Sequence, residues 1–158
     1  MIKAIVFDFD DTLVPYKEVG IKAHQDTAKK LGLRIPSDKE IGDLFGLPWD
    51  KFIKLLWPDA NTKVFREKYH SVKYPIRTPI PGAIELINKL HAKGMELYIL
   101  SSRHGESLND LTKKTLPIEK FKGIYSSDDT KFHKPDVRVF HRILEDYDPE
   151  EIVFVGDT

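Results

Sequence analysis

The sequence of 158 residues contains no cysteine, which excludes disulfide bonds, thiolate metal sites and cysteine nucleophiles. It has no apolar run approaching the roughly 18 residues that a transmembrane helix needs, so no membrane span is expected. The first residues run straight into a strand-like segment, without a basic-then-apolar leader. A cytoplasmic location is therefore the expectation.

Net charge is also absent. The 25 basic and 25 acidic residues cancel, so neither nucleic acid nor an anionic membrane surface is expected as a partner held by bulk attraction. The six histidines show no metal-ligand spacing. What is present is a hydrophobic content of 41%, which is enough for one ordinary core with a modest insertion.

Short β-branched segments alternate with amphipathic helical segments at the start and in the second half of the chain. Strands are expected at residues 3–9, 95–100, 123–127 and 151–155, and helices at 83–94, 106–115 and 136–147. Alternation at this spacing favours a parallel sheet with right-handed crossovers. The expected fold class is therefore α/β, with a Rossmann-like parallel sheet as its core.

The intervening segment has helical periodicity and no strand pattern. Helices are expected at residues 17–33, 37–45, 48–57 and 61–74. Ser37, followed three residues later by Glu40, has the capping-box pattern of a helix start. We expect residues 15–76 to form an inserted all-helical unit, while residues 1–14 and 77–158 form the α/β core.

Three aspartates follow the first strand within four positions, in the stretch DFDDT. Asp8 and Asp10 are two apart in extended backbone, so both side chains can face one site while Phe9 faces the core. Like charges this close repel each other, and a hard divalent cation such as Mg²⁺ would remove the repulsion. The alternative interpretation is a solvated turn, where aspartate is common.

Polar residues also follow the other expected strands. Ser101 and Ser102 follow the second strand, Lys134 lies in the HKP stretch after the third, and Asp157 follows the fourth. Ligands of open parallel sheets bind beyond the carboxyl ends of the strands, so these side chains should share one edge with the acids of DFDDT. Together they can hold a divalent cation and a phosphate. Each alone has an ordinary alternative, namely a helix N-cap, an exposed lysine or a turn.

The ordered stretches DFDDTL, YILSSR, HKP and VFVGD resemble the four motifs of the haloacid dehalogenase-like (HAD) superfamily of phosphohydrolases, across the whole chain. The helical insertion is similar to the small cap of phosphoglycolate phosphatase-like members. The resemblance implies hydrolysis of a small phosphate monoester, with Mg²⁺ as cofactor, through an aspartyl-phosphate intermediate. It also implies a small phosphorylated metabolite as partner.

The resemblance further implies a role for individual residues. Asp8 would attack phosphorus, Asp10 would protonate the leaving alcohol and later activate water, and Lys134 would neutralise the phosphoryl oxygens. The implied phosphate-binding residues are Asp8, Phe9, Asp10, Ser101, Ser102 and Lys134. The implied Mg²⁺ ligands are Asp8, the backbone carbonyl of Asp10, and Asp157. Thr12 matches the usual hydroxyl position of the motif, whereas Asp11 stands where the family most often has glycine.

Two alternatives stay open. A phosphomutase of the β-phosphoglucomutase type would share the motifs. A non-catalytic fragment is the second, because the sequence stops at GDT, where family members continue with a further acid, helix and strand. The core is therefore expected to be truncated at the C-terminus, with the strand at 151–155 on an exposed edge. Asp10 argues for phosphate chemistry over dehalogenation, and the oligomeric state stays unknown.

Overall fold

The computed structural model describes residues 1–72, 74–75 and 77–157. The chain divides into two compact units, one of Met1–Pro15 with Ile76–Thr158 and the other of Tyr16–Pro75. Of the residues in the expected domain boundaries and helices, Lys73, Ile76 and Thr158 lie outside the described residues. Each unit is considered by itself below.

The first unit is built on a four-stranded parallel sheet. Its strands are β1 (Ala4–Phe7), β2 (Glu96–Leu100), β3 (Phe121–Tyr125) and β4 (Ile152–Val155). They lie in the order β3-β2-β1-β4, which makes β4 an edge strand. All three pairings are parallel. The α/β class with a parallel sheet is thereby confirmed.

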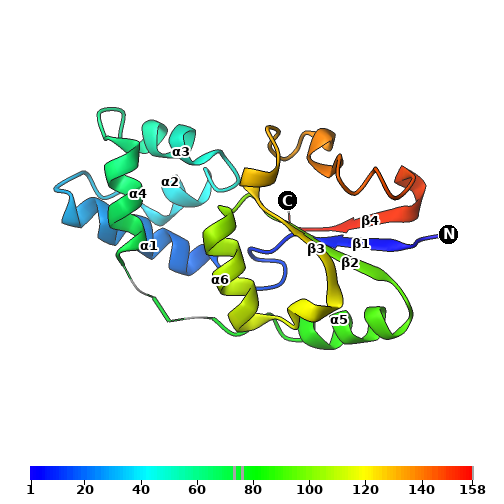
Figure 1. The fold of residues 1–158 in the computed structure, drawn as a ribbon. Coiled ribbons are helices and arrows are strands. Elements are labelled where there is room, and N and C mark those ends of the chain that lie inside the picture. Colours follow the sequence, from blue (N-terminus) through cyan, green and yellow to red (C-terminus); the bar gives the residue numbers. More distant parts are fainter. Residues whose placement is uncertain (73, 76, 158) are drawn as a thin grey trace. The chain divides into compact units, whose positions relative to one another are not determined.

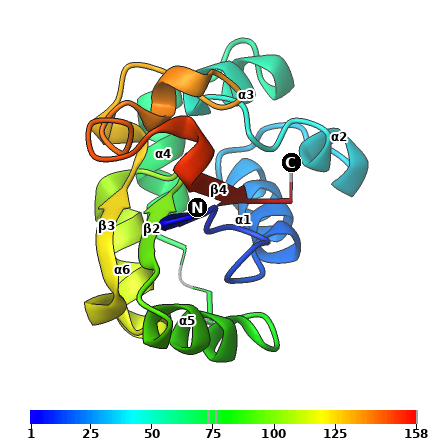
Figure 2. The same cartoon turned by 90° about the vertical axis from the view of Figure 1, so that its right-hand side faces the viewer.

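Each face of this sheet has its own apolar layer. On one face, α5 (Ala83–Ala92) and α6 (Gly105–Thr115) pack against side chains of β1 and β2 (Figures 1 and 2). On the other face lies the chain between β3 and β4, which buries Val139 and Ile143 against Val6 and Tyr98. Strands covered on both faces explain why β1 is buried at every position.

The expected helix at 136–147 is wrong. The segment contains only a 3-10 turn, Val137–Phe140, followed by further turns. Asp136 caps that turn by accepting a hydrogen bond from the Arg138 backbone N–H at 2.9 Å. The following N–H groups bond mostly to the carbonyl three residues back, as Ile143 does to Phe140 at 2.8 Å. The segment nevertheless presents an apolar face to the sheet, which is the pattern that suggested a helix.

The second unit is helical, as the sequence predicted for this stretch. Its helices are α1 (Lys17–Lys30), α2 (Asp38–Gly42), α3 (Trp49–Leu56) and α4 (Thr62–His70). Ser37 and Glu40 form the expected capping box at the start of α2. The interior is rich in aromatic side chains, and Phe52 and Trp57 are buried in it while Trp49 packs against them, so these residues form this unit's own core.

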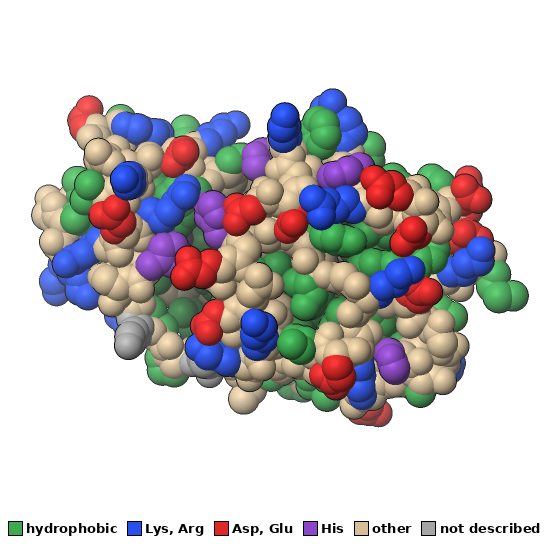
Figure 3. All heavy atoms as spheres, in the orientation of Figure 1, with side chains coloured by type: hydrophobic (Ala, Val, Ile, Leu, Met, Phe, Trp, Pro, Cys, Tyr) green, Lys and Arg blue, Asp and Glu red, His purple; other side chains and the backbone are tan. Residues whose placement is uncertain are grey.

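Charged side chains of both signs share the face of the molecule that Figure 3 draws. Figure 3 shows acidic and basic side chains interspersed on the face drawn, without a continuous field of one sign. No helix within the described ranges is both long enough and apolar enough to cross a membrane.

Candidate active site

The parallel register brings the carboxyl ends of the strands to one edge of the sheet. Phe7, the last residue of β1, lies opposite Ile99 of β2 and Val155 of β4. The Asp8 backbone N–H continues this ladder by donating to the Val155 carbonyl at 2.8 Å, and the Ser101 N–H donates to the last residue of β3 at 2.9 Å. Residues directly after the strands are therefore fixed relative to one another by backbone bonds.

Asp8 is a buried carboxylate, with 7% of the residue exposed. Its Oδ2 forms an ion pair with the Lys134 ammonium, which comes from a segment 126 residues further along the chain. Its Oδ1 accepts a hydrogen bond from the Phe9 backbone N–H at 2.7 Å. Lys134 also lies over the ring of Phe154, 5.6 Å from its centroid. The structure thus brings together Asp8, the expected nucleophile, and Lys134, the cation expected to neutralise the phosphoryl oxygens.

Asp10 lies in the same loop and faces a different cation. Arg103 donates from Nε to Oδ2 at 3.1 Å and from Nη2 to Oδ1 at 2.5 Å, a bidentate pair. Burial raises the pKa of the Asp10 carboxyl, the Arg103 guanidinium lowers it, and the charges of Asp8 and Asp11 raise it, with a net upward direction. Burial and the Arg103 guanidinium therefore act on the pKa of this carboxyl in opposite directions.

A tight turn holds these acids. The Leu13 N–H donates to the Phe9 carbonyl at 3.0 Å, and the Asp11 N–H donates to the Val14 carbonyl at 2.8 Å. Asp11 has φ of 56°, in the left-handed region that aspartate tolerates better than most residues. This explains how aspartate can stand where glycine is usual. The Thr12 Oγ1 is buried and has no hydrogen-bond partner in the part of the chain that is described.

A depression of about 240 Å³, open to solvent, lies beside Lys134. Ser101 and Ser102 line it together with Lys134, whereas Asp8, Phe9 and Asp10 are not among the described residues that do so. The Ser101 hydroxyl is buried and accepts a hydrogen bond from the Arg103 backbone N–H at 3.1 Å. The other lining residues are Leu100, Ser126, Ser127, Thr130, Phe132, His133 and Val139.

Asp157 follows β4 at the same edge and is exposed. Its neighbour Gly156 runs close to Asp8, because a Cβ built at Gly156 would lie 3.6 Å from the Asp8 Cβ. Within the described ranges no three acidic or histidine side chains gather into a metal site, and Asp8 and Asp10 face Lys134 and Arg103 instead. The donors at this edge are oxygen atoms of the kind that Mg²⁺ prefers, so they fit that ion in type.

Sequence reasoning missed Arg103. It stands at the end of the quoted stretch YILSSR, two residues after Ser101, but an arginine near a strand end has many possible partners. The strand-end rule places Arg103 at the same edge of the sheet, but the sequence holds no signal for which side chain it contacts there.

The chain is similar to known proteins over nearly all of its length. Residues 5–158 match the family model described as "Haloacid dehalogenase-like hydrolase". The glyceraldehyde 3-phosphate phosphatase of Methanothermobacter thermautotrophicus is 28% identical over 99% of this chain and 77% of that protein. The phosphoglycolate phosphatase of Aquifex aeolicus is 29% identical over 99% of this chain and 76% of that protein.

The fold is shared with solved structures. A haloacid dehalogenase-like hydrolase from Bacteroides fragilis superposes with a TM-score of 0.87, at 20% identity, covering 100% of this chain and 80% of that one. At this identity the likeness shows the fold alone. Together with the family match, it agrees with the resemblance drawn from the four motifs.

Proposed function

The chain belongs to the haloacid dehalogenase-like hydrolase family, and on that premise we propose that it is a Mg²⁺-dependent phosphatase acting through an aspartyl-phosphate. The observation that carries the proposal is the ion pair of the buried Asp8 carboxylate with the partly buried Lys134 ammonium at the carboxyl edge of the sheet. Burying a charge pair is costly to solvation, and apolar packing would stabilise the fold at least as well. A buried carboxylate beside an ammonium is what attack on a phosphate dianion requires.

The chemistry divides into two transfers. An Asp8 carboxylate oxygen attacks phosphorus, the bond from phosphorus to the ester oxygen breaks, and Asp10 gives a proton to the departing alkoxide. Water then attacks the phosphorus of the aspartyl-phosphate, Asp10 takes the water proton, and Asp8 is released as carboxylate. Lys134 offsets phosphoryl charge in both steps, which is the main demand of phosphoryl transfer.

Phosphate contacts beyond these come from Ser101, the backbone N–H groups of Phe9 and Asp10, and Ser102. The Phe9 N–H now bonds to Asp8, so it would exchange that partner for a phosphoryl oxygen. Asp8, the Asp10 carbonyl oxygen and Asp157 would hold Mg²⁺, which when bound neutralises negative charge on the phosphoryl group and the acids.

The substrate we propose is a small phosphorylated metabolite. The curated relatives reported above are named for small phosphate esters. The helical unit, Tyr16–Pro75, would serve as the cap that excludes water from the leaving group. We also propose that the reaction takes place in the cytoplasm.

The test is release of inorganic phosphate from an aryl phosphate, with Mg²⁺ and with chelator. We expect Mg²⁺-dependent turnover that falls more than about a thousandfold in Asp8→Asn. Asp110→Asn is the control, because Asp110 is an exposed acid of α6 that pairs with Lys114 at 2.7 Å. Phosphate release also separates hydrolysis from a mutase reaction. A folded chain without turnover would overturn the proposal and favour a non-catalytic fragment.

A further inference from the structure

Among the described contacts, the Asp10 carboxyl takes the hydrogen bonds to both its oxygens from one side chain, that of Arg103. The two residues lie 93 positions apart, one in the loop after β1 and the other between β2 and α6. A bidentate bond to a planar guanidinium fixes both the position and the plane of a carboxyl group. The orientation of Asp10 is therefore set by Arg103.

Arg103 is itself held in place. Its Nη1 donates to the Ser107 Oγ at 3.1 Å, and its guanidinium carbon lies 5.9 Å from the centre of the Phe9 ring. The side chain is only 13% exposed. Its backbone is fixed too, because the Arg103 carbonyl accepts from the Ser127 N–H at 2.9 Å. A guanidinium held at several points can act as a rigid support for a catalytic acid.

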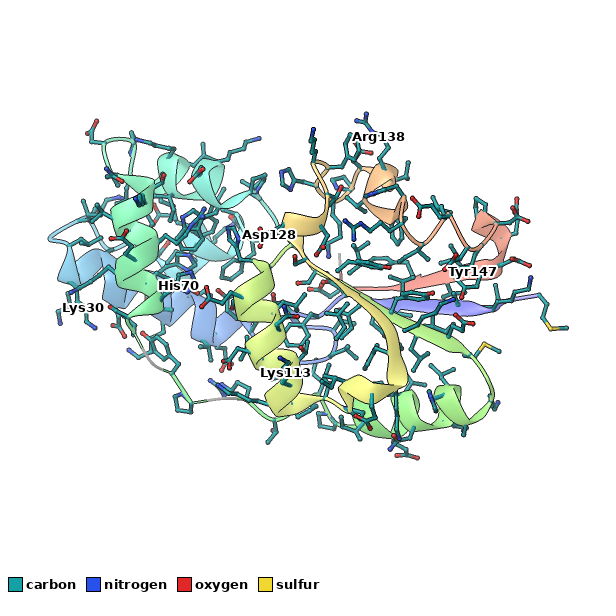
Figure 4. All side chains as sticks on the ribbon, viewed as in Figure 1. Lys30, His70, Lys113, Asp128, Arg138 and Tyr147 are labelled. Carbon is teal, nitrogen blue, oxygen red and sulfur yellow. The ribbon has the colours of Figure 1, made fainter. Side chains whose placement is uncertain are left out.

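A second arginine–aspartate pair in the same chain has hydrogen bonds of similar length and serves for comparison. Arg138 donates from Nε and Nη2 to Asp136, at 3.0 and 2.6 Å to the nearer oxygens. Its side chain is 64% exposed and projects away from the sheet in Figure 4. Exposed pairs of this kind contribute little. The Arg103 pair differs in the exposure of its arginine, which is 13% against 64% for Arg138, and in lying beside the candidate nucleophile.

We propose that Arg103 is a positioning residue, which aims the Asp10 carboxyl at the ester oxygen of the leaving group. The inference rests on the proposed phosphatase function. Displacement of a catalytic group by about 1 Å can cost a hundredfold in rate. Removal of the Arg103 guanidinium should therefore slow the step in which Asp10 protonates the leaving group. Binding of the phosphoryl group, which depends on Lys134 and Ser101, should change little.

A comparison of substrates with different leaving groups distinguishes a positioning role of Arg103 from a structural one. An alkyl alcohol leaves slowly without a proton, whereas a nitrophenolate leaves readily without one. In Arg103→Met we expect kcat for phosphoglycolate to fall by about 30-fold or more, kcat for p-nitrophenyl phosphate to fall by less than about 3-fold, and KM to change by less than about 3-fold for both. Arg138→Met, the control, should change none of these values.

A double-mutant cycle tests whether Arg103 acts through Asp10. In an Asp10→Asn background, Arg103→Met should cause no further loss on phosphoglycolate beyond about 2-fold, because the group it aims is gone. Arg103→Lys keeps the charge but cannot form two parallel bonds, so it should behave like Arg103→Met. Full rescue by lysine would overturn the positioning role, and so would equal losses on both esters.

Folding is controlled separately. Circular dichroism and the urea midpoint of each variant establish that the fold is kept. If Arg103→Met does not fold, Ser107→Ala removes one support of the guanidinium, and a selective loss of about 3-fold on phosphoglycolate is expected. An unselective loss in that variant would overturn the inference. If the wild-type chain shows no turnover, the proposed function is contradicted. If Asp10→Asn lowers kcat for phosphoglycolate more than for p-nitrophenyl phosphate but Arg103→Met does not, only the positioning role is contradicted.

Discussion

His24 is a buried histidine in the helical unit, with 3% of the residue exposed. Its ring lies 4.6 Å from the ring of Phe52 and 4.7 Å from that of Tyr69, measured between centroids. Burial lowers the pKa of His24 to about 4, against a partial opposite effect from its hydrogen bond to the Gly20 carbonyl. The imidazole is thus neutral in the folded unit and becomes charged on exposure to water.

This residue should make the helical unit acid-sensitive. The pKa in the unfolded chain is about 6.5, so the unfolded state binds more protons than the folded state between about pH 4 and 6.5. The free energy of unfolding should therefore reach its full value above about pH 6.5 and fall by roughly 3 kcal/mol as the pH drops to about 4. Both tryptophans, Trp49 and Trp57, lie in this unit, so their fluorescence during urea unfolding reports on it alone.

His24→Phe should flatten that pH dependence, because no proton is taken up at this position on unfolding. His91→Gln changes an exposed histidine of α5 and should leave the slope as in the wild type. An unchanged slope in His24→Phe would contradict the prediction.

The candidate site shows which contacts a sequence can predict. Asp8 and Lys134 lie far apart in the chain, yet their meeting follows from a rule about strand ends, because parallel register fixes where each strand stops. The pairing of Asp10 with Arg103 depends on side-chain rotamers and on the turn at Asp11, neither of which periodicity records. Chemistry carried by backbone register is therefore predictable, and chemistry carried by side-chain choice is not.

At the scale of elements, strand and helix identities followed from periodicity except in one segment. The apolar spacing of Val139 and Ile143 predicted a helix. In the structure the same two side chains pack against the sheet from a series of turns. Turns and helices can bury the same face, because they differ in which carbonyl each N–H reaches and not in which side chains point inward. The sequence pattern records burial, and backbone bonding decides the element.

Two adjacent residues of this segment should differ sharply in stability. Ile143 is 1% exposed, whereas Leu144 is 39% exposed. Ile143→Ala should lower the free energy of unfolding by about 3 kcal/mol through the cavity it leaves. Leu144→Ala should lower it by less than about 1 kcal/mol. Urea unfolding followed by circular dichroism measures both, and equal losses would show that the segment does not pack as described.

At the scale of the whole molecule, one edge strand of the described sheet is apolar and partly exposed. Within the described ranges β4 pairs with β1 alone, and its four residues, Ile152–Val155, carry no charge. Val153 and Val155 lie in register with Ile5 and Phe7 of β1. They are on the face of the sheet that α5 and α6 cover at β1 and β2. They remain 38% and 36% exposed. An uncharged apolar strand with free backbone groups is a template for pairing with another chain.

We therefore expect the chain to self-associate through β4 as its concentration rises. Val153→Lys should shift association to higher concentration, because a charge on an edge strand must be desolvated when a second strand pairs with it. Val137→Lys is the matched control, since Val137 is 73% exposed but lies off the sheet. Sedimentation velocity over a concentration series measures the effect. A wild-type chain that stays monomeric throughout would contradict the prediction and indicate that the short length of β4 protects it. Equal shifts in the two variants would place the association elsewhere.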